Sequence, residues 1–96
     1  HMQAGDFAVS AAGRDKGRCL AVLSVSDGYC LLADGGVRKC EKPKRKKIRH
    51  VTLTGERSEY LAERIKNGET VTNSMLRKEI SRYRQSLGVK EVESLG

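Results

Sequence analysis

Short apolar runs in the first half of the chain have patterns typical of β-strands. Apolar residues alternate at 6–11, the runs at 19–25 and 29–33 are almost continuously apolar, and together they predict three strands. The dipeptide Asp27-Gly28 between the second and third runs predicts a tight hairpin, because it suits the type I′ turn that right-twisted strands require. The sequence therefore predicts an antiparallel sheet near the start of the chain.

Two further strands are predicted before the helical part of the sequence begins. A glycine turn at 34–36 is followed by a short fourth strand at 37–40, which ends before Pro43. A fifth strand is predicted at 48–54, where apolar and polar residues alternate again. Several short strands joined by glycine turns are typical of a small barrel, and we expect an SH3-like antiparallel barrel over residues 3–54.

The second predicted strand is apolar on both of its faces. Leu20 and Val22 point to one side of the strand, and Ala21, Leu23 and Val25 point to the other. A face open to solvent would carry polar residues, so another part of the chain should cover the outside of the sheet.

Residues 55–88 predict that cover, as a pair of helices packed on the barrel. The first helix is expected at 56–67, with Thr54 or Ser58 as its N-cap. Its apolar residues recur one helical turn apart, which predicts one buried side.

The second predicted helix runs over 74–87, with Thr72 or Asn73 as its N-cap and Gly88 as its end. Residues 89–96 are expected to be a frayed tail. One side of this helix has an apolar stripe at helical spacing, made of Leu76, Ile80, Tyr83 and Leu87. The other sides carry cations that we interpret as a solvated face: Arg77, Lys78, Arg82 and Arg84.

The charge is positive and concentrated in the first half of the chain. The formal net charge is +7 and the isoelectric point about 9.6. Residues 1–50 hold 11 Lys and Arg against 5 Asp and Glu, a net of +6, whereas residues 51–96 hold 8 against 7, a net of +1. Such a balance favours a polyanionic partner, which the first half of the chain should contact.

The densest positive segment is 38–50, with eight Lys and Arg against one carboxylate. Such a run repels itself unless it meets counter-charge, so nucleic-acid phosphate is the expected partner. We expect the part at 42–49 to be flexible and its phosphate contacts to be nearly interchangeable. The alternatives are a solvated loop without a partner and a localisation-like basic patch.

A second basic element is the loop at 13–17, which has a glycine at each end. Arg14, Lys16 and Arg18 could extend the surface of the 38–50 segment, because neighbouring loops of a small barrel often share one end. The alternative is that Asp15 simply pairs with a neighbouring cation. The expected RNA-binding residues are Arg14, Lys16, Gly17, Arg18, Lys39, Lys42, Lys44, Arg45, Lys46, Lys47 and Arg49.

The order of these elements resembles a known family. Residues 5–9, the glycine-bracketed loop with the strand after it, and the turn, strand and basic run that follow resemble the KOW motif of ribosomal and transcription-elongation proteins. The central glycine of that motif matches Gly17. The chain looks most like the KOW-containing large-subunit ribosomal proteins numbered fourteen in archaea and eukaryotes, together with small bacterial KOW RNA-binding proteins. The resemblance implies ribosomal RNA as the partner, with ribosomal proteins as further contacts.

The aromatic content favours a folded RNA. The chain has four aromatic residues, most of them at expected core positions: Phe7, Tyr29, Tyr60 and Tyr83. Recognition of single strands usually stacks bases on aromatic rings, so recognition of a structured RNA through its phosphates and shape fits this chain better.

No pattern in the sequence predicts catalysis or a cofactor. His50 stands alone within the basic run, and there is no G-x-G-x-x-G or P-loop motif. Cys19, Cys30 and Cys40 form no C-x-x-C pair, so we expect reduced thiols and no metal. No apolar run reaches the ~18 residues of a membrane span, and we expect a soluble, cytoplasmic protein that is monomeric when free. The rival function is a protein-interaction module that docks on the translation or transcription machinery.

Overall fold

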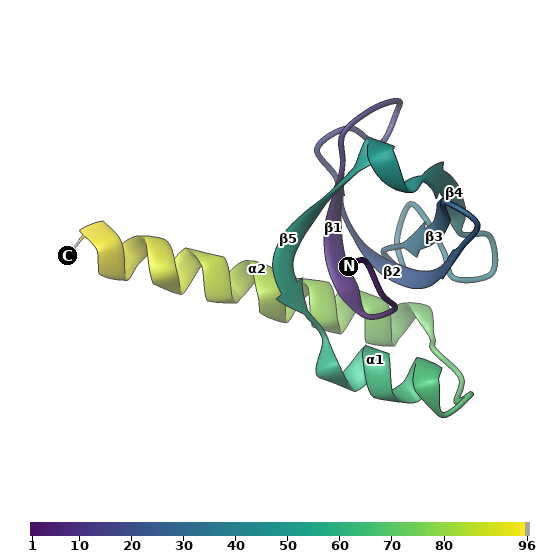
Figure 1. Cartoon of the computed structure of the whole chain (residues 1–96). Helices are drawn as coiled ribbons and strands as arrows, with labels where there is room; N and C mark the ends of the chain where they lie inside the picture. Colours follow the sequence, from purple (N-terminus) through teal and green to yellow (C-terminus); the bar gives the residue numbers. More distant parts are fainter. Residues whose placement is uncertain (96) are drawn as a thin grey trace.

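The computed structural model describes the backbone of residues 1–95 and the side chains of residues 1–87. It forms one antiparallel sheet followed by two helices (Figure 1). The elements are β1 (Asp6–Ser10), β2 (Cys19–Ser26), β3 (Tyr29–Ala33), β4 (Lys44–Lys47), a 3₁₀ turn η1 (Ile48–His50), β5 (Val51–Arg57), α1 (Glu59–Lys66) and α2 (Asn73–Leu95). The strand order is β4-β3-β2-β1-β5, with every neighbouring pair antiparallel.

The predicted class, mostly β with C-terminal helices, is confirmed, but the sheet is not a closed barrel. β4 and β5 are its two edges, and they do not pair with each other. They are joined by η1, whose ends bond to other segments: the Ile48 N–H donates to the Gly28 carbonyl, and the His50 carbonyl accepts from the Ala11 N–H. The edges therefore approach each other only at this turn, and the sheet curls without closing (Figure 1).

Two of the predicted strands are misplaced. Residues 37–40 form a turn region, because the Asp34 side chain accepts hydrogen bonds from the N–H groups of Gly36 and Arg38 and holds the backbone back on itself. The fourth strand is β4 instead, which pairs with the edge of β3. The predicted strand at 48–54 begins three residues later, because 48–50 form η1, and it extends to Arg57.

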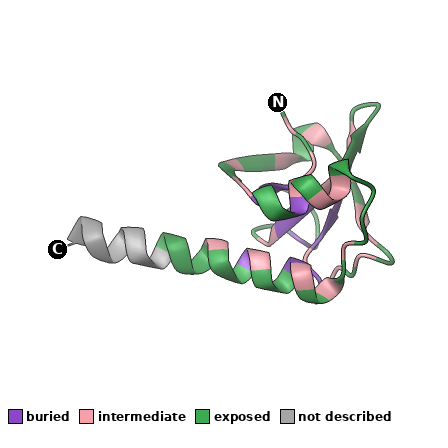
Figure 2. Ribbon diagram, turned by 90° about the horizontal axis from the view of Figure 1, so that it is seen from below, coloured by how far each residue is buried: buried purple, intermediate pink, exposed green. Residues whose placement is uncertain are grey.

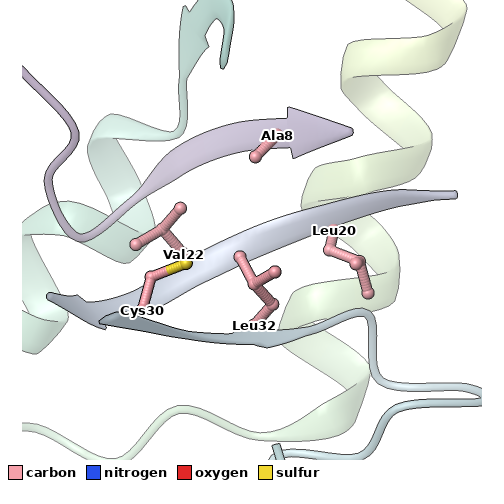
Figure 3. Close-up of a cluster of buried hydrophobic side chains, with 5 residues drawn as sticks. All are labelled: Ala8, Leu20, Val22, Cys30 and Leu32. Carbon is pink, nitrogen blue, oxygen red and sulfur yellow. The ribbon is translucent and has the colours of Figure 1, made fainter. Parts of the chain in front are cut away.

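The inner side of the curled sheet holds one hydrophobic cluster (Figure 3). Its five buried side chains come from β1, β2 and β3, and none is more than 2% exposed: Ala8, Leu20, Val22, Cys30 and Leu32. Met2, Ile48 and Val51 pack against this cluster. Leu20 and Val22 thus occupy one face of β2, as the sequence predicts.

The outer face of the sheet is covered by the helices, which confirms the prediction made from the two-faced β2. Ala21 and Ala33 of the sheet pack against Leu61 of α1 and Leu76 of α2, and all four are fully buried. Small alanines on the sheet let the helices approach closely. Figure 2 shows the buried positions of α2 on the side that faces the sheet.

The aromatic member of the α2 stripe joins the helix to β1. The Tyr83 ring stacks on the Phe7 ring, with centroids 4.7 Å apart and planes inclined by 17°. Leu87, the last member of the stripe, is 39% exposed and lies at the edge of this packing. The stripe therefore anchors α2 through its first three members.

The helix starts follow the predicted capping chemistry. Ser58 caps α1 by accepting a hydrogen bond from the Leu61 N–H at 3.0 Å, and its hydroxyl donates to Glu79 of α2 at 2.6 Å. Thr72 accepts from the Met75 N–H at 3.2 Å and caps α2. One capping residue therefore also ties the two helices together.

The predicted end of the second helix at Gly88 is wrong, because α2 continues to Leu95. A glycine inside a helix costs about 1 kcal/mol relative to alanine but does not force the helix to end. The predicted frayed tail, 89–96, lies outside the residues whose side chains are described.

Candidate nucleic-acid interface

The central part of the basic segment is an ordered edge strand, β4, with the sequence Lys-Arg-Lys-Lys. The expectation that residues 42–49 form a flexible run is therefore wrong. The free edge of β3 supplies backbone partners for these residues, and the ladder outweighs the low strand preference of lysine. Lysines on an edge strand also discourage pairing with another sheet.

The inward-facing cations of β4 are Lys44 and Lys46. They lie opposite Leu32 and Cys30, which belong to the inner cluster, so their aliphatic stems cover that cluster and both side chains are half-buried. The Lys46 Nζ donates to the Ala12 carbonyl at 2.6 Å. This bond places β4 directly beside the loop between β1 and β2.

The outward-facing cations of β4 are Arg45 and Lys47, and both are exposed. The Arg45 guanidinium carbon lies 3.6 Å from the centroid of the Tyr29 ring. Stacking on the ring restricts the guanidinium to one plane while its N–H edge stays free to donate. Sequence reasoning missed this role of Tyr29, because the pairing of β3 with β4 brings the two side chains together.

The loop between β1 and β2, residues 11–18, is built around a buried carboxylate. Asp15 is 3% exposed and accepts three hydrogen-bond contacts from Arg38, at 2.9 to 3.2 Å. Arg18 lies 3.5 Å from Asp15 and 3.6 Å from Asp34. Asp15 therefore pairs with Arg38 and lies close to Arg18, whereas Arg14 and Lys16 have no carboxylate within 4 Å among the described side chains.

This network stabilises the charged forms of Asp15 and Arg38. The hydrogen bond from Arg38 holds the pKa of Asp15 below its usual value, although burial acts in the opposite direction. The same bond raises the pKa of Arg38. Both Arg18 and Arg38 lie within 4 Å of a carboxylate of the fold, and of these two Arg18 was an expected RNA contact.

The other expected contacts have no carboxylate within 4 Å among the described side chains. In the loop these are Arg14 and Lys16, both exposed. In the longer segment they are Lys39, Lys42, Lys44, Arg45, Lys46, Lys47 and Arg49. The structure thus brings the two predicted basic elements together, and it separates the cations that lie near a carboxylate from those that do not.

Gly17 has the backbone conformation that the loop needs. Its φ of +85° lies in the left-handed region that favours glycine, and its N–H donates to the Ser10 carbonyl at 2.8 Å. No atom lies within 4 Å of the position that a Cβ would take. Glycine is therefore favoured at this position by its backbone conformation and not by a lack of space for a side chain.

Part of the loop also borders an open groove of about 980 Å³, with α2 on the opposite side. Lys16, Gly17 and Arg18 line this groove together with Arg77 and Arg84 of α2. Four cations of α2 were predicted to form one solvated face, but they fall into two groups. Arg77 and Arg84 line the groove, and the other two do not. Lys78 is exposed, and Arg82 pairs with Glu79 at 3.1 Å.

The described residues contain no group of three or more His, Cys, Asp and Glu side chains that could hold a metal ion. The three cysteines are free thiols, and burial raises the pKa of each. Among residues 1–95 no helix combines the length and apolar character that crossing a membrane requires.

Comparison of the chain with models of known protein families found no match, and comparison with curated proteins found none either.

Proposed function

We propose that the protein binds structured RNA through a basic surface made of β4 and the adjacent β1–β2 loop. The observation that carries this proposal is the ordered edge strand of four cations without carboxylate partners among the described side chains. Cations held without counter-charge favour a polyanionic ligand, because binding relieves their mutual repulsion and releases counterions from the nucleic acid.

The order of β4 makes these cations better ligands than the same residues in a flexible loop. Its backbone is fixed by pairing with β3, the Lys46 side chain is bonded to the loop, and Arg45 is stacked on Tyr29. Less conformational freedom is then lost when RNA binds. A fixed array of cations also favours an RNA whose phosphates are themselves fixed.

The aromatic side chains support a folded RNA over a single strand. Phe7 and Tyr83 stack on each other, and Tyr29 lies under Arg45. Tyr60 is 47% exposed on α1, and the Arg64 guanidinium carbon lies 5.7 Å from the centroid of its ring. No cluster of open rings is present among the described residues on which successive bases could stack.

Ribosomal RNA is the RNA we propose, in line with the resemblance to KOW proteins, and the protein would then act in the cytoplasm as a binding protein without catalytic activity or a cofactor. The KOW glycine, Gly17, lies in the loop that Lys46 ties to β4. That position supports a role for the loop in orienting the RNA against the strand.

The test compares two double variants that remove the same charge. Arg45→Gln/Lys47→Gln removes the outward cations of β4, and Lys66→Gln/Lys78→Gln removes two exposed cations from the helices. Fluorescence anisotropy with a labelled hairpin of ribosomal RNA should show affinity about tenfold to thirtyfold lower for the first and within about threefold of the parent for the second. Equal losses for both variants would mean that only net charge matters and would contradict the proposed surface.

A further inference from the structure

The groove between α2 and the sheet is a second surface of different chemistry. Its walls are the loop at 16–19, the turn at 34–37 and the α2 residues from Arg77 to Leu87. Its volume of about 980 Å³ is large enough for several side chains of another molecule. None of its lining residues belongs to β4, so a ligand in the groove would leave that strand open.

The groove differs from β4 in its exposed apolar side chains. Val37 is 64% exposed and Leu87 39% exposed, and both line the groove. Val9, Ile80 and Tyr83 contribute further apolar surface. Large apolar side chains left this open beside a concave surface are typical of a site that another molecule covers.

The charged groups of the groove are mostly positive. Lys16 and Arg84 have no ion pair among the described residues, and Arg77 donates to the Gly35 carbonyl at 2.6 Å while remaining exposed. Among the described lining residues the one carboxylate is Asp34, and Arg18 lies 3.6 Å from it. A complementary ligand therefore carries negative charge together with apolar groups.

The apolar part of the groove fits aliphatic or aromatic side chains better than nucleotides. Tyr83 is the one ring in the described lining, and one of its faces is already stacked on Phe7. The remaining apolar surface is aliphatic and offers bases little stacking. Arginines at the rim of an apolar surface suit the carboxylates of a peptide.

We propose that this groove binds an acidic segment of a partner protein, with apolar side chains of the segment seated on Val37 and Leu87 and its carboxylates paired with Arg84 and Lys16. The inference goes beyond RNA binding and does not depend on it. It gives the protein two adjoining surfaces, one for an RNA and one for a protein, which share Lys16 of the β1–β2 loop.

The experiment selects short random peptides displayed on phage against the immobilised full chain at about 150 mM salt. The enriched sequences are then synthesised and measured against two variants. Val37→Ser/Arg84→Glu alters the groove, and Lys47→Glu makes the same change of charge on β4. All three positions are exposed, so both proteins should fold, which circular dichroism and thermal unfolding check.

We expect the enriched peptides to combine Asp or Glu with Leu, Ile, Val or Phe. Their affinity should fall at least about tenfold in the groove variant and less than about threefold in Lys47→Glu. Failure to enrich any sequence, enrichment of peptides without acidic residues, or equal losses in both variants would overturn the proposal. It would also be overturned if short single-stranded RNA lost more affinity in the groove variant than in Lys47→Glu, since the groove would then be an RNA site.

Discussion

The β1–β2 loop and β4 are both rich in cations and lie side by side, but they differ in whether a carboxylate lies near those cations. The loop surrounds a buried carboxylate, Asp15, which balances Arg38 and lies close to Arg18. β4 has no carboxylate within 4 Å of its cations among the described side chains. The comparison shows that a count of basic residues overstates the number of cations available to a partner, because some of those residues pair with carboxylates of the fold.

The two regions should therefore respond in opposite ways to substitution. Removing the outward charges of β4, Arg45 and Lys47, should weaken RNA binding and leave stability nearly unchanged. Removing the loop carboxylate should lower stability and leave RNA binding nearly unchanged.

The largest effect is expected from replacing all four cations of β4. Thr at Lys44, Arg45, Lys46 and Lys47 retains a preference for strands and removes the charge. Affinity for structured RNA should fall roughly 10²–10³-fold, because the counterion release of about four contacts is lost. A single Lys44→Ala change should cost only a few-fold. Anisotropy titrations measure both, and a quadruple variant that is folded and binds like the parent would remove β4 from the interface.

The next effect concerns stability. Asp15→Asn removes a buried charged acceptor and leaves the Arg38 guanidinium without its carboxylate. The midpoint of thermal unfolding should fall by about 5–10 °C, whereas RNA affinity should stay the same or rise slightly because a negative charge is lost. Asp27→Asn, in the exposed turn of the β2–β3 hairpin, is the matched control and should change neither quantity. An Asp15→Asn protein as stable as the parent would show that the network contributes nothing to the fold.

The same pair predicts a pH dependence. The pKa of Asp15 is lower in the folded chain than its ordinary value of 3.8, first because of the hydrogen bond from Arg38. The stabilisation is therefore complete above that ordinary value and is lost as the pH falls below it toward the folded pKa. Thermal unfolding between pH 7 and pH 3 should show a steeper acid loss for the parent than for Asp15→Asn. Parallel curves for the two proteins would contradict this role of Asp15.

A further effect is expected in the loop itself. Gly17→Val forces a β-branched residue into a left-handed conformation and should cost about 1–3 kcal/mol of stability without a steric clash, since the space around Gly17 is open. The folded variant should lose preference for ribosomal RNA over bulk RNA while keeping weak, salt-sensitive binding. Gly68→Val is the control, because Gly68 also has a positive φ and open space but follows α1. If folded Gly17→Val discriminates between RNAs as the parent does, the loop is only a turn.

Several features of the fold could be predicted because they follow from local patterns. The two apolar faces of β2 required a cover, and α1 and α2 provide it. β4 was missed because four successive cations have a low preference for strands, and only the open edge of β3 makes the pairing favourable. The end of α2 was misplaced because a single glycine is a weak stop signal once the helix is anchored.

The residues of the candidate site could be predicted more readily than the contacts that each of them makes. Every cation can be read from the sequence. Asp15 and Arg38, however, are 23 positions apart, and no local pattern indicates that they pair. The stacking of Arg45 on Tyr29 likewise depends on strand register. The groove beside α2 was missed because its walls come from three separate segments.

The most direct test of the account is the salt dependence of RNA affinity for the parent and for Arg45→Gln/Lys47→Gln. If five to seven cations engage the RNA, the logarithm of the parent's affinity should fall against the logarithm of salt with a slope of about −4 to −6. The double variant should have a slope smaller in magnitude by about 1.5–2, and Lys66→Gln/Lys78→Gln should keep the parent's slope. A nearly flat response of the parent, or an unchanged slope when the outward cations of β4 are removed, would contradict the claim that this strand binds RNA.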